Sequence, residues 1–152
     1  MQIIPFDPKY TKDFAALNVE WLEKYFAVEP HDAELLEQCQ ETIIDKGGYI
    51  FFGQIDDEIV GAFALIKIDS TTYELGKMAV TPKYQSQRLG QQLMEHCMDL
   101  AKSQGWKKLV LYSSRRLPNA LHIHRKYGFQ EVVLEKNSPY QRSDIKMEAR
   151  LL

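Results

Sequence analysis

The sequence predicts an α/β fold in which helices flank a central mixed β-sheet. Segments with apolar residues at helical spacing alternate along the chain with short β-branched and aromatic runs, which are typical of strands. The 152 residues contain no repeat and no long Pro/Gly/Ser-rich linker, and a chain of this length suits one hydrophobic core. We therefore expect residues 1–152 to form a single domain.

The N-terminal third predicts a strand followed by two helices. In order, these are a strand at residues 2–6, a helix that Pro8 opens and that runs to Tyr25, and a helix over residues 35–44. Both helices carry apolar residues every three or four positions. Gly47 and Gly48 end the second helix in the usual C-terminal manner.

Three consecutive strands follow, because the apolar period changes from helical to alternating. They cover residues 49–55, 59–68 and 73–80, and the acidic turn at 56–58 joins the first two as a hairpin. Strict alternation in the third strand predicts two faces. One face carries Glu74, Gly76, Met78 and Val80, and the other carries Tyr73, Leu75, Lys77 and Ala79.

The remaining residues predict two more helices and three more strands. In order, these are a helix at 90–104, a strand at 109–112, a helix at 119–127, and strands at 129–134 and 144–151. The strand at 109–112 is apolar throughout, so we expect it to be covered on both faces. Parallel and antiparallel neighbours should therefore share one sheet.

Composition excludes several classes of function. Lys and Arg number 19 and Asp and Glu 21, which gives a net charge of −2, and no basic stripe indicates a nucleic-acid partner. The two cysteines lie in apolar helical patterns and suggest a reducing compartment. With no signal peptide and no stretch of about 20 apolar residues, we expect a cytoplasmic protein without a membrane partner.

The segment from Val80 to Gly90 connects a strand to a helix and is the most informative in the chain. The first turn of a helix presents unpaired N–H groups and a partial positive charge, which favour an anion such as a pyrophosphate. A plain strand-to-helix turn, in which Gly90 only relieves the backbone, is the alternative. The segment has neither a Walker sequence nor a dinucleotide fingerprint.

This segment resembles the phosphate loop of the GCN5-related N-acetyltransferases (the GNAT family), which reads Gln/Arg-x-x-Gly-x-Gly/Ala. Gln85, Leu89 and Gly90 match its first, fifth and sixth positions, and Arg88 replaces the first glycine. Residues 119–129 also resemble the Asn-Ala-x-x-Leu-Tyr-x-Lys-x-Gly-Phe segment of that family. The resemblance spans residues 73–129 and implies the acyl-CoA N-acyltransferase-like fold.

The resemblance also implies acetyl-CoA as the cosubstrate and a set of residues that contact it. These are Met78, Ala79, Val80, Gln85, Ser86, Gln87, Arg88, Leu89, Gly90, Gln91 and Asn119. Asn119 has an alternative role as the N-cap of the following helix. Further candidates for contacts with phosphate are Lys83, Arg115 and Arg116, which are equally ordinary surface cations. An arginine at the first glycine position either adopts a positive φ, at a cost of about 1–2 kcal/mol, or an ordinary one.

Acetyl transfer to an amine needs a base and benefits from an acid. Glu74 is the candidate base, because an amine of pKa about 10.4 must lose a proton. A structural partnership of Glu74 with a cation such as Lys77 is the alternative. His124 stands where the family usually has a tyrosine, and Tyr127 lies one turn later. Either can protonate the leaving thiolate, or the thiolate can leave unaided.

The acceptor side is less well defined by the sequence. The resemblance implies contacts from the first two helices and from the turn before the last strand, which supply Tyr25, Phe26, Glu29 and Tyr140. Aromatic rings together with Glu29 and Asp32 suit a cationic amine, although acids at a helix start are also common caps. We expect no metal site, because His122 and His124 point about 200° apart on a helix.

These observations predict an acetyl-CoA-dependent N-acetyltransferase that acts on a primary amine of a small molecule or peptide. Direct attack within a ternary complex is the expected route. The alternative is a non-catalytic acyl-CoA-binding regulatory module, which the departures at Arg88 and His124 favour. Dimers are common in the family, so the resemblance also raises a homodimer as one option.

Overall fold

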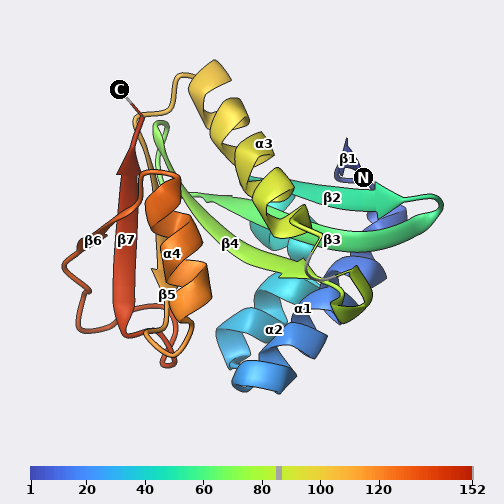
Figure 1. Ribbon diagram of the computed structural model, residues 1–152, viewed down its shortest axis with the longest axis horizontal. Coiled ribbons are helices and arrows are strands. Elements are labelled where there is room, and N and C mark those ends of the chain that lie inside the picture. The colour runs from blue at the N-terminus through green and yellow to red at the C-terminus, as the bar shows by residue number, and fades with distance from the viewer. Residues whose placement is uncertain (85–86, 152) are drawn as a thin grey trace.

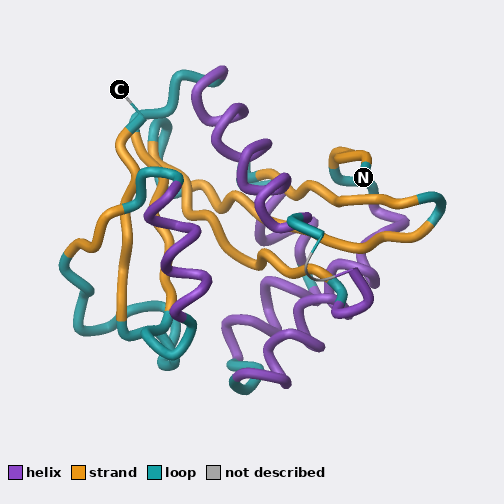
Figure 2. The backbone as a smooth tube through the Cα atoms, viewed as in Figure 1, coloured by secondary structure: helices purple, strands orange, loops and turns teal. Residues whose placement is uncertain are grey.

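The computed structural model describes residues 1–84 and 87–151 (Figures 1 and 2). The strands are β1 Gln2–Pro5, β2 Tyr49–Ile55, β3 Glu58–Lys67, β4 Thr72–Val80, β5 Lys108–Ser113, β6 Gln130–Val132 and β7 Ile145–Arg150. The helices are α1 Thr11–Tyr25, α2 Pro30–Glu37, α3 Leu89–Ser103 and α4 Pro118–Lys126. Short helical turns occur at Pro8–Tyr10, Gln40–Ile44 and Pro82–Tyr84.

The strands form one mixed sheet of seven, in the order β1-β2-β3-β4-β5-β7-β6. Every neighbouring pair is antiparallel except β4 and β5, which are parallel. This arrangement confirms the predicted mixed α/β sheet and the order of its elements. Within the described residues, no helix is long and apolar enough to span a membrane.

Helices cover both faces of the sheet (Figure 1). On one face, α1 and α2 bury Phe14 and Leu36 against Phe52 of β2. On the other face, α3 and α4 bury Leu93 and Leu121 in a core with the strand residues Phe63 and Leu109. Two apolar layers of this kind are the usual way for a sheet to bury both faces.

The second predicted helix is divided in the structure. Helix α2 ends at Glu37, and a π-type turn over Gln40–Ile44 follows it. The apolar pattern continues across the division because Leu36, Cys39 and Ile43 all pack into the same core. A continuous pattern therefore does not reveal a local change in the number of residues per turn.

Strand β4 contains a bulge, and the two predicted faces are wrong beyond Gly76. Two residues, Lys77 and Met78, lie opposite the single residue Phe63 of β3, and Lys77 has a φ of 52°. An extra residue of this kind reverses the alternation. Lys77 therefore lies on the face of Glu74, whereas Met78 and Val80 pack with the α3 core.

Strands β4 and β5 pair over only three residues and then diverge. The pairs are Thr72 with Lys108, Tyr73 with Leu109 and Glu74 with Val110. Figure 1 shows the two strands separating beyond this point, with α4 beside β5. The edge of β4 from Leu75 to Val80 that faces β5 is consequently left open.

Candidate active site

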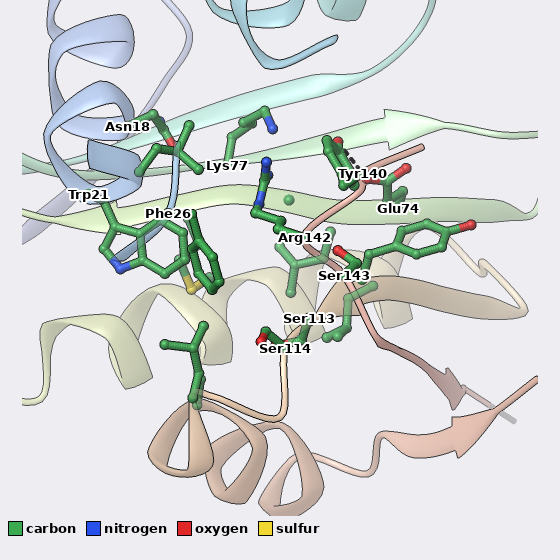
Figure 3. Close-up of a pocket in the computed structure, with 18 of the residues that line it drawn as sticks. Asn18, Trp21, Phe26, Glu74, Lys77, Ser113, Ser114, Tyr140, Arg142 and Ser143 are labelled. Atoms are coloured by element: carbon green, nitrogen blue, oxygen red, sulfur yellow. Dashed lines mark hydrogen bonds between the residues drawn. The ribbon is translucent and has the colours of Figure 1, made fainter. Parts of the chain in front are cut away.

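The space between the diverging strands is a cavity of about 230 Å³ (Figure 3). It is lined by the middle of β4, the end of β5, helices α1 and α4, and the loop before β7. A groove of about 780 Å³ continues from it along the last residues of β4 and the first turns of α3 and α4. The two hollows share Trp21, Met78, Leu117 and Ala120, so they form one continuous site.

Glu74 lies in the cavity wall, at the last position where β4 pairs with β5. It is 8% exposed, and its Oε2 accepts a hydrogen bond of 3.2 Å from the hydroxyl of Tyr140. Burial raises the pKa of Glu74, because a low-polarity environment disfavours the charged carboxylate. The hydrogen-bond partner of Glu74 is thus Tyr140, and a carboxyl with a raised pKa is better suited to take a proton from an amine.

A buried ion cluster joins α2, β4 and the loop before β7. Asp32 is fully buried, and its carboxylate accepts hydrogen bonds from Nζ of Lys77 at 2.5 Å and from both terminal nitrogens of Arg142 at 2.6 and 2.9 Å. Burial alone would raise the pKa of Asp32, but the bonds from Arg142 and Lys77 outweigh it and lower that pKa to about 2. Asp32 is therefore ionised at neutral pH.

Glu29 is also engaged within this cluster. Its carboxylate accepts hydrogen bonds from the backbone N–H groups of Gln141 and Arg142 and from the Arg142 side chain. Neither Glu29 nor Asp32 lines the cavity. Both acids instead hold the loop that carries Tyr140, so the structure does not bring them to the cavity in which we expected them to bind a cationic acceptor.

The cavity contains functional candidates that the sequence analysis did not identify. Lys77 and Arg142 line the wall beside Glu74, and Figure 3 shows their nitrogen ends close together. A charged residue inside a strand of otherwise mostly apolar residues was the available signal for Lys77. Arg142 lies in a polar loop, where no local pattern separates a buried arginine from an exposed one.

The two candidate acids differ in position. His124 lines the cavity, and its Nδ1 is buried without a hydrogen-bond partner among the described residues. Burial lowers the pKa of His124 to about 4, so the ring is neutral at pH 7. Tyr127 lies outside both hollows and donates a hydrogen bond of 2.9 Å to Glu95. The structure therefore brings His124, but not Tyr127, to the site.

The predicted phosphate loop leads into the N-terminus of α3. Arg88 is the residue before the helix and has a φ of 61° and a ψ of 23°, so it adopts the left-handed conformation that the family's glycine would favour. Gln91 accepts hydrogen bonds from Arg88 and Lys126. Gln85 and Ser86 lie outside the described residues, and Gln87 is exposed.

The other predicted contacts divide between the groove and the surface. The groove is lined by Tyr25, Met78, Ala79, Val80, Arg88, Leu89, Gly90, Gln91, Arg116 and Asn119, and the cavity by Phe26 and Tyr140. Lys83 pairs with Glu58, and Arg115 pairs with Glu131. Neither of these two cations lines either hollow.

Sequence comparison identifies the family. The sequence profile described as "Acetyltransferase (GNAT) family" matches residues 14–129. The chain belongs to the acetyltransferase (GNAT) family. The matched segment begins in α1, includes the β4 bulge and the α3 loop, and ends after α4. All these elements contribute to the site of this GNAT protein.

Individual relatives share less than a third of their aligned residues with this GNAT chain. The alanine N-acetyltransferase of ribosomal protein bS18 from Escherichia coli K12 is 29% identical over 89 residues, which are 59% of this chain and 60% of that protein. A GNAT acetyltransferase from Staphylococcus aureus Mu50 superposes with a TM-score of 0.88 at 18% identity over 99% of both chains. A GNAT acetyltransferase from Elizabethkingia anophelis, solved with acetyl-CoA bound, has a TM-score of 0.68 at 23% identity over 99% of this chain and 97% of that one. These structures show the same fold.

Substituting Asp32→Ala should strongly destabilise the protein, because it leaves the buried cations Lys77 and Arg142 without their common partner. Breaking a buried pair in this way costs about 3–5 kcal/mol. Urea unfolding measures the loss. Glu58→Ala, which removes an exposed pair with Lys83, is the control and should change stability little. Equal effects of the two substitutions would contradict the structural role of Asp32.

The contribution of His124 to folding stability should fall as pH drops from about 6.5 to about 4, because the unfolded chain binds a proton at His124 that the folded chain does not. The loss from this one group approaches about 3 kcal/mol, at about 1.36 kcal/mol for each pH unit. Chemical unfolding of the wild type and of His124→Phe across this range measures it. The variant should lose less stability on acidification, and identical pH profiles would contradict the buried, neutral ring.

Proposed function

We propose that this protein transfers an acetyl group from acetyl-CoA to a primary amine of a small molecule or peptide, within a ternary complex. The observation that carries the proposal is the open edge of β4, which borders a cavity lined by the buried carboxylate of Glu74 and by His124. Membership of the GNAT family supports the reaction class. The E. coli relative, which is named as an alanine N-acetyltransferase, also supports an amine acceptor.

The residues present fit acetyl-CoA. Backbone groups on the open edge of β4 lack strand partners in β5, and buried backbone groups need partners. The first N–H groups of α3, with Arg88 and Arg116 beside them, suit the phosphates. Bound there, acetyl-CoA would supply the acetyl group as an activated thioester.

Glu74 acts as the base in this proposal. Its carboxylate lies in the cavity wall, and the raised pKa increases its affinity for the proton of an incoming ammonium. The donor from Tyr140 holds the carboxylate in one orientation. The backbone N–H groups around the bulge at Lys77 and Met78 serve as fixed donors for the oxygen of the reacting carbonyl, which is an arrangement that needs no reorganisation.

His124 is the group that we assign to assist the leaving sulfur, because it lines the same cavity as Glu74. Because the ring is neutral at pH 7, it assists through a neutral N–H rather than as an imidazolium. Tyr127, engaged by Glu95 outside the cavity, has no part in this step.

We also propose that residues 1–152 act as one cytoplasmic domain. Both cysteines are buried and free, which agrees with a reducing compartment. The homodimer remains a prediction from the family resemblance.

Incubation with acetyl-CoA and a panel of primary amines tests the proposal directly. Free thiol should appear only when an amine is present, and the acetylated amine should be found by mass spectrometry. Binding of CoA without thiol release over the whole panel would instead favour the non-catalytic binding module.

Substituting Glu74→Gln should lower turnover by about 10²–10⁴ fold while CoA affinity stays unchanged. Glutamine keeps the size of the side chain and still accepts the hydrogen bond from Tyr140, so the fold should persist. Steady-state kinetics and calorimetry measure the two effects separately. Glu58→Gln, on the exposed hairpin, is the matched control, and full activity of Glu74→Gln would remove the base from the proposal.

His124→Phe should lower turnover more than Tyr127→Phe, because only the former side chain lines the cavity. The comparison uses the same amine and saturating acetyl-CoA for both variants. A larger loss in Tyr127→Phe would contradict the assignment. Equal and small losses would mean that the thiolate leaves without assistance.

A further inference from the structure

We infer that the acceptor is a small primary amine that carries a carboxylate within a few bonds of its nitrogen, as an amino acid does. This inference rests on the proposed function and concerns the same site. It follows from the distribution of charge on the cavity wall and from the small size of the cavity.

Two of the three charged side chains that line the cavity, among the described residues, are cations. Among the described residues that line the cavity, Glu74 is the one acid, whereas Lys77 and Arg142 are both cations. The balancing acids Glu29 and Asp32 lie outside the lining. A ligand in the cavity therefore meets one carboxylate, which the reaction uses as the base, and the exposed parts of two cations.

Both cations retain donors that the ion cluster does not use. Among the described residues, Lys77 has one hydrogen-bond acceptor, Asp32, and its ammonium has three N–H groups. Arg142 is bound through its two terminal nitrogens, and its Nε has no acceptor among those residues. Unused donors on two cations can bind a carboxylate through charge-assisted hydrogen bonds.

Tyr140 keeps the base close to these cations. Its hydroxyl group donates to Glu74, while Nζ of Lys77 lies 4.5 Å and the guanidinium carbon of Arg142 lies 4.6 Å from the centre of its ring. The hydroxyl of Tyr140 thus contacts the acid, while its ring contacts both cations. An amine nitrogen beside Glu74 then places a carboxylate on the same small molecule near Lys77 and Arg142.

The size and remaining lining of the cavity agree with such a ligand. A volume of about 230 Å³ corresponds to about eight waters at about 30 Å³ each. Ser113, Ser114 and Ser143 add hydroxyl groups to the wall, and Trp21 and Phe26 add aromatic surface for a side chain. A polyamine fits poorly, because a second ammonium would face Lys77 and Arg142, and like charges repel.

Matched pairs of acceptors test the inference on the wild-type protein. L-serine is compared with L-serinamide, and L-phenylalanine with L-phenylalaninamide, while spermidine represents the polyamines. Thiol release with acetyl-CoA gives kcat/KM for each. We expect at least one amino acid to exceed its amide and spermidine by tenfold or more.

The outcomes separate this inference from the proposed function. Acetylation of the amides or of spermidine as fast as the amino acids would overturn the carboxylate preference and leave the acetyltransferase intact. Thiol release with none of a broad set of amines, despite acetyl-CoA binding, would overturn both.

Variants then locate the preference. Lys77→Met should lower kcat/KM for the amino acid at least tenfold and change that for its amide much less, so that their ratio approaches one. Lys83→Met, at an exposed site, is the control and should keep the wild-type ratio. An unchanged ratio in folded Lys77→Met and Arg142→Met proteins would overturn the assignment. If either variant fails to fold, the wild-type ratio still decides the inference.

Discussion

The site depends on the short pairing between β4 and β5. Two parallel strands that stayed paired would form a continuous sheet with no room for a ligand, but these strands separate after Glu74 and Val110. The open edge of β4 must satisfy its backbone groups in another way. The bulge at Lys77 increases the local bend and turns that side chain into the cavity. The edge that we propose for the cofactor and the cavity that we propose for the acceptor therefore arise from the same departure from regular pairing.

The buried ion cluster is the second requirement of this architecture. The loop before β7 carries Tyr140, whose hydroxyl group donates a hydrogen bond to Glu74. Asp32 and Glu29 at the start of α2 bind Arg142 and so hold this loop against the sheet. The same contacts leave Lys77 and Arg142 facing the cavity. Structural charges thereby determine both the position of Glu74, the proposed base, and the electrostatic character of the cavity that we propose for the acceptor.

The sequence was sufficient to predict the order of the elements and much of the groove. Helical and alternating periods predicted the order of the helices and strands, although the second helix was expected as one segment at 35–44. The strand-loop-helix segment at 80–90 identified the groove that Arg88, Leu89 and Gly90 line. The bulge at Lys77 was not predictable, because nothing in the local pattern marks a reversal of alternation. The sequence did not reveal that Glu29 and Arg142 pair with each other, because they lie more than 100 positions apart in the chain. Tyr127 shared a helical stripe with His124, but it follows the last turn of α4 and lies beyond the cavity.

The most direct test is a crystal structure of the protein with acetyl-CoA. The account predicts that the pantetheine chain lies along β4 from Gly76 to Val80, that the pyrophosphate contacts the first turn of α3, and that the sulfur lies near His124. The acetyl group should then face the cavity that holds Glu74. A cofactor bound elsewhere, with β4 and β5 closed together and the cavity absent, would contradict the account.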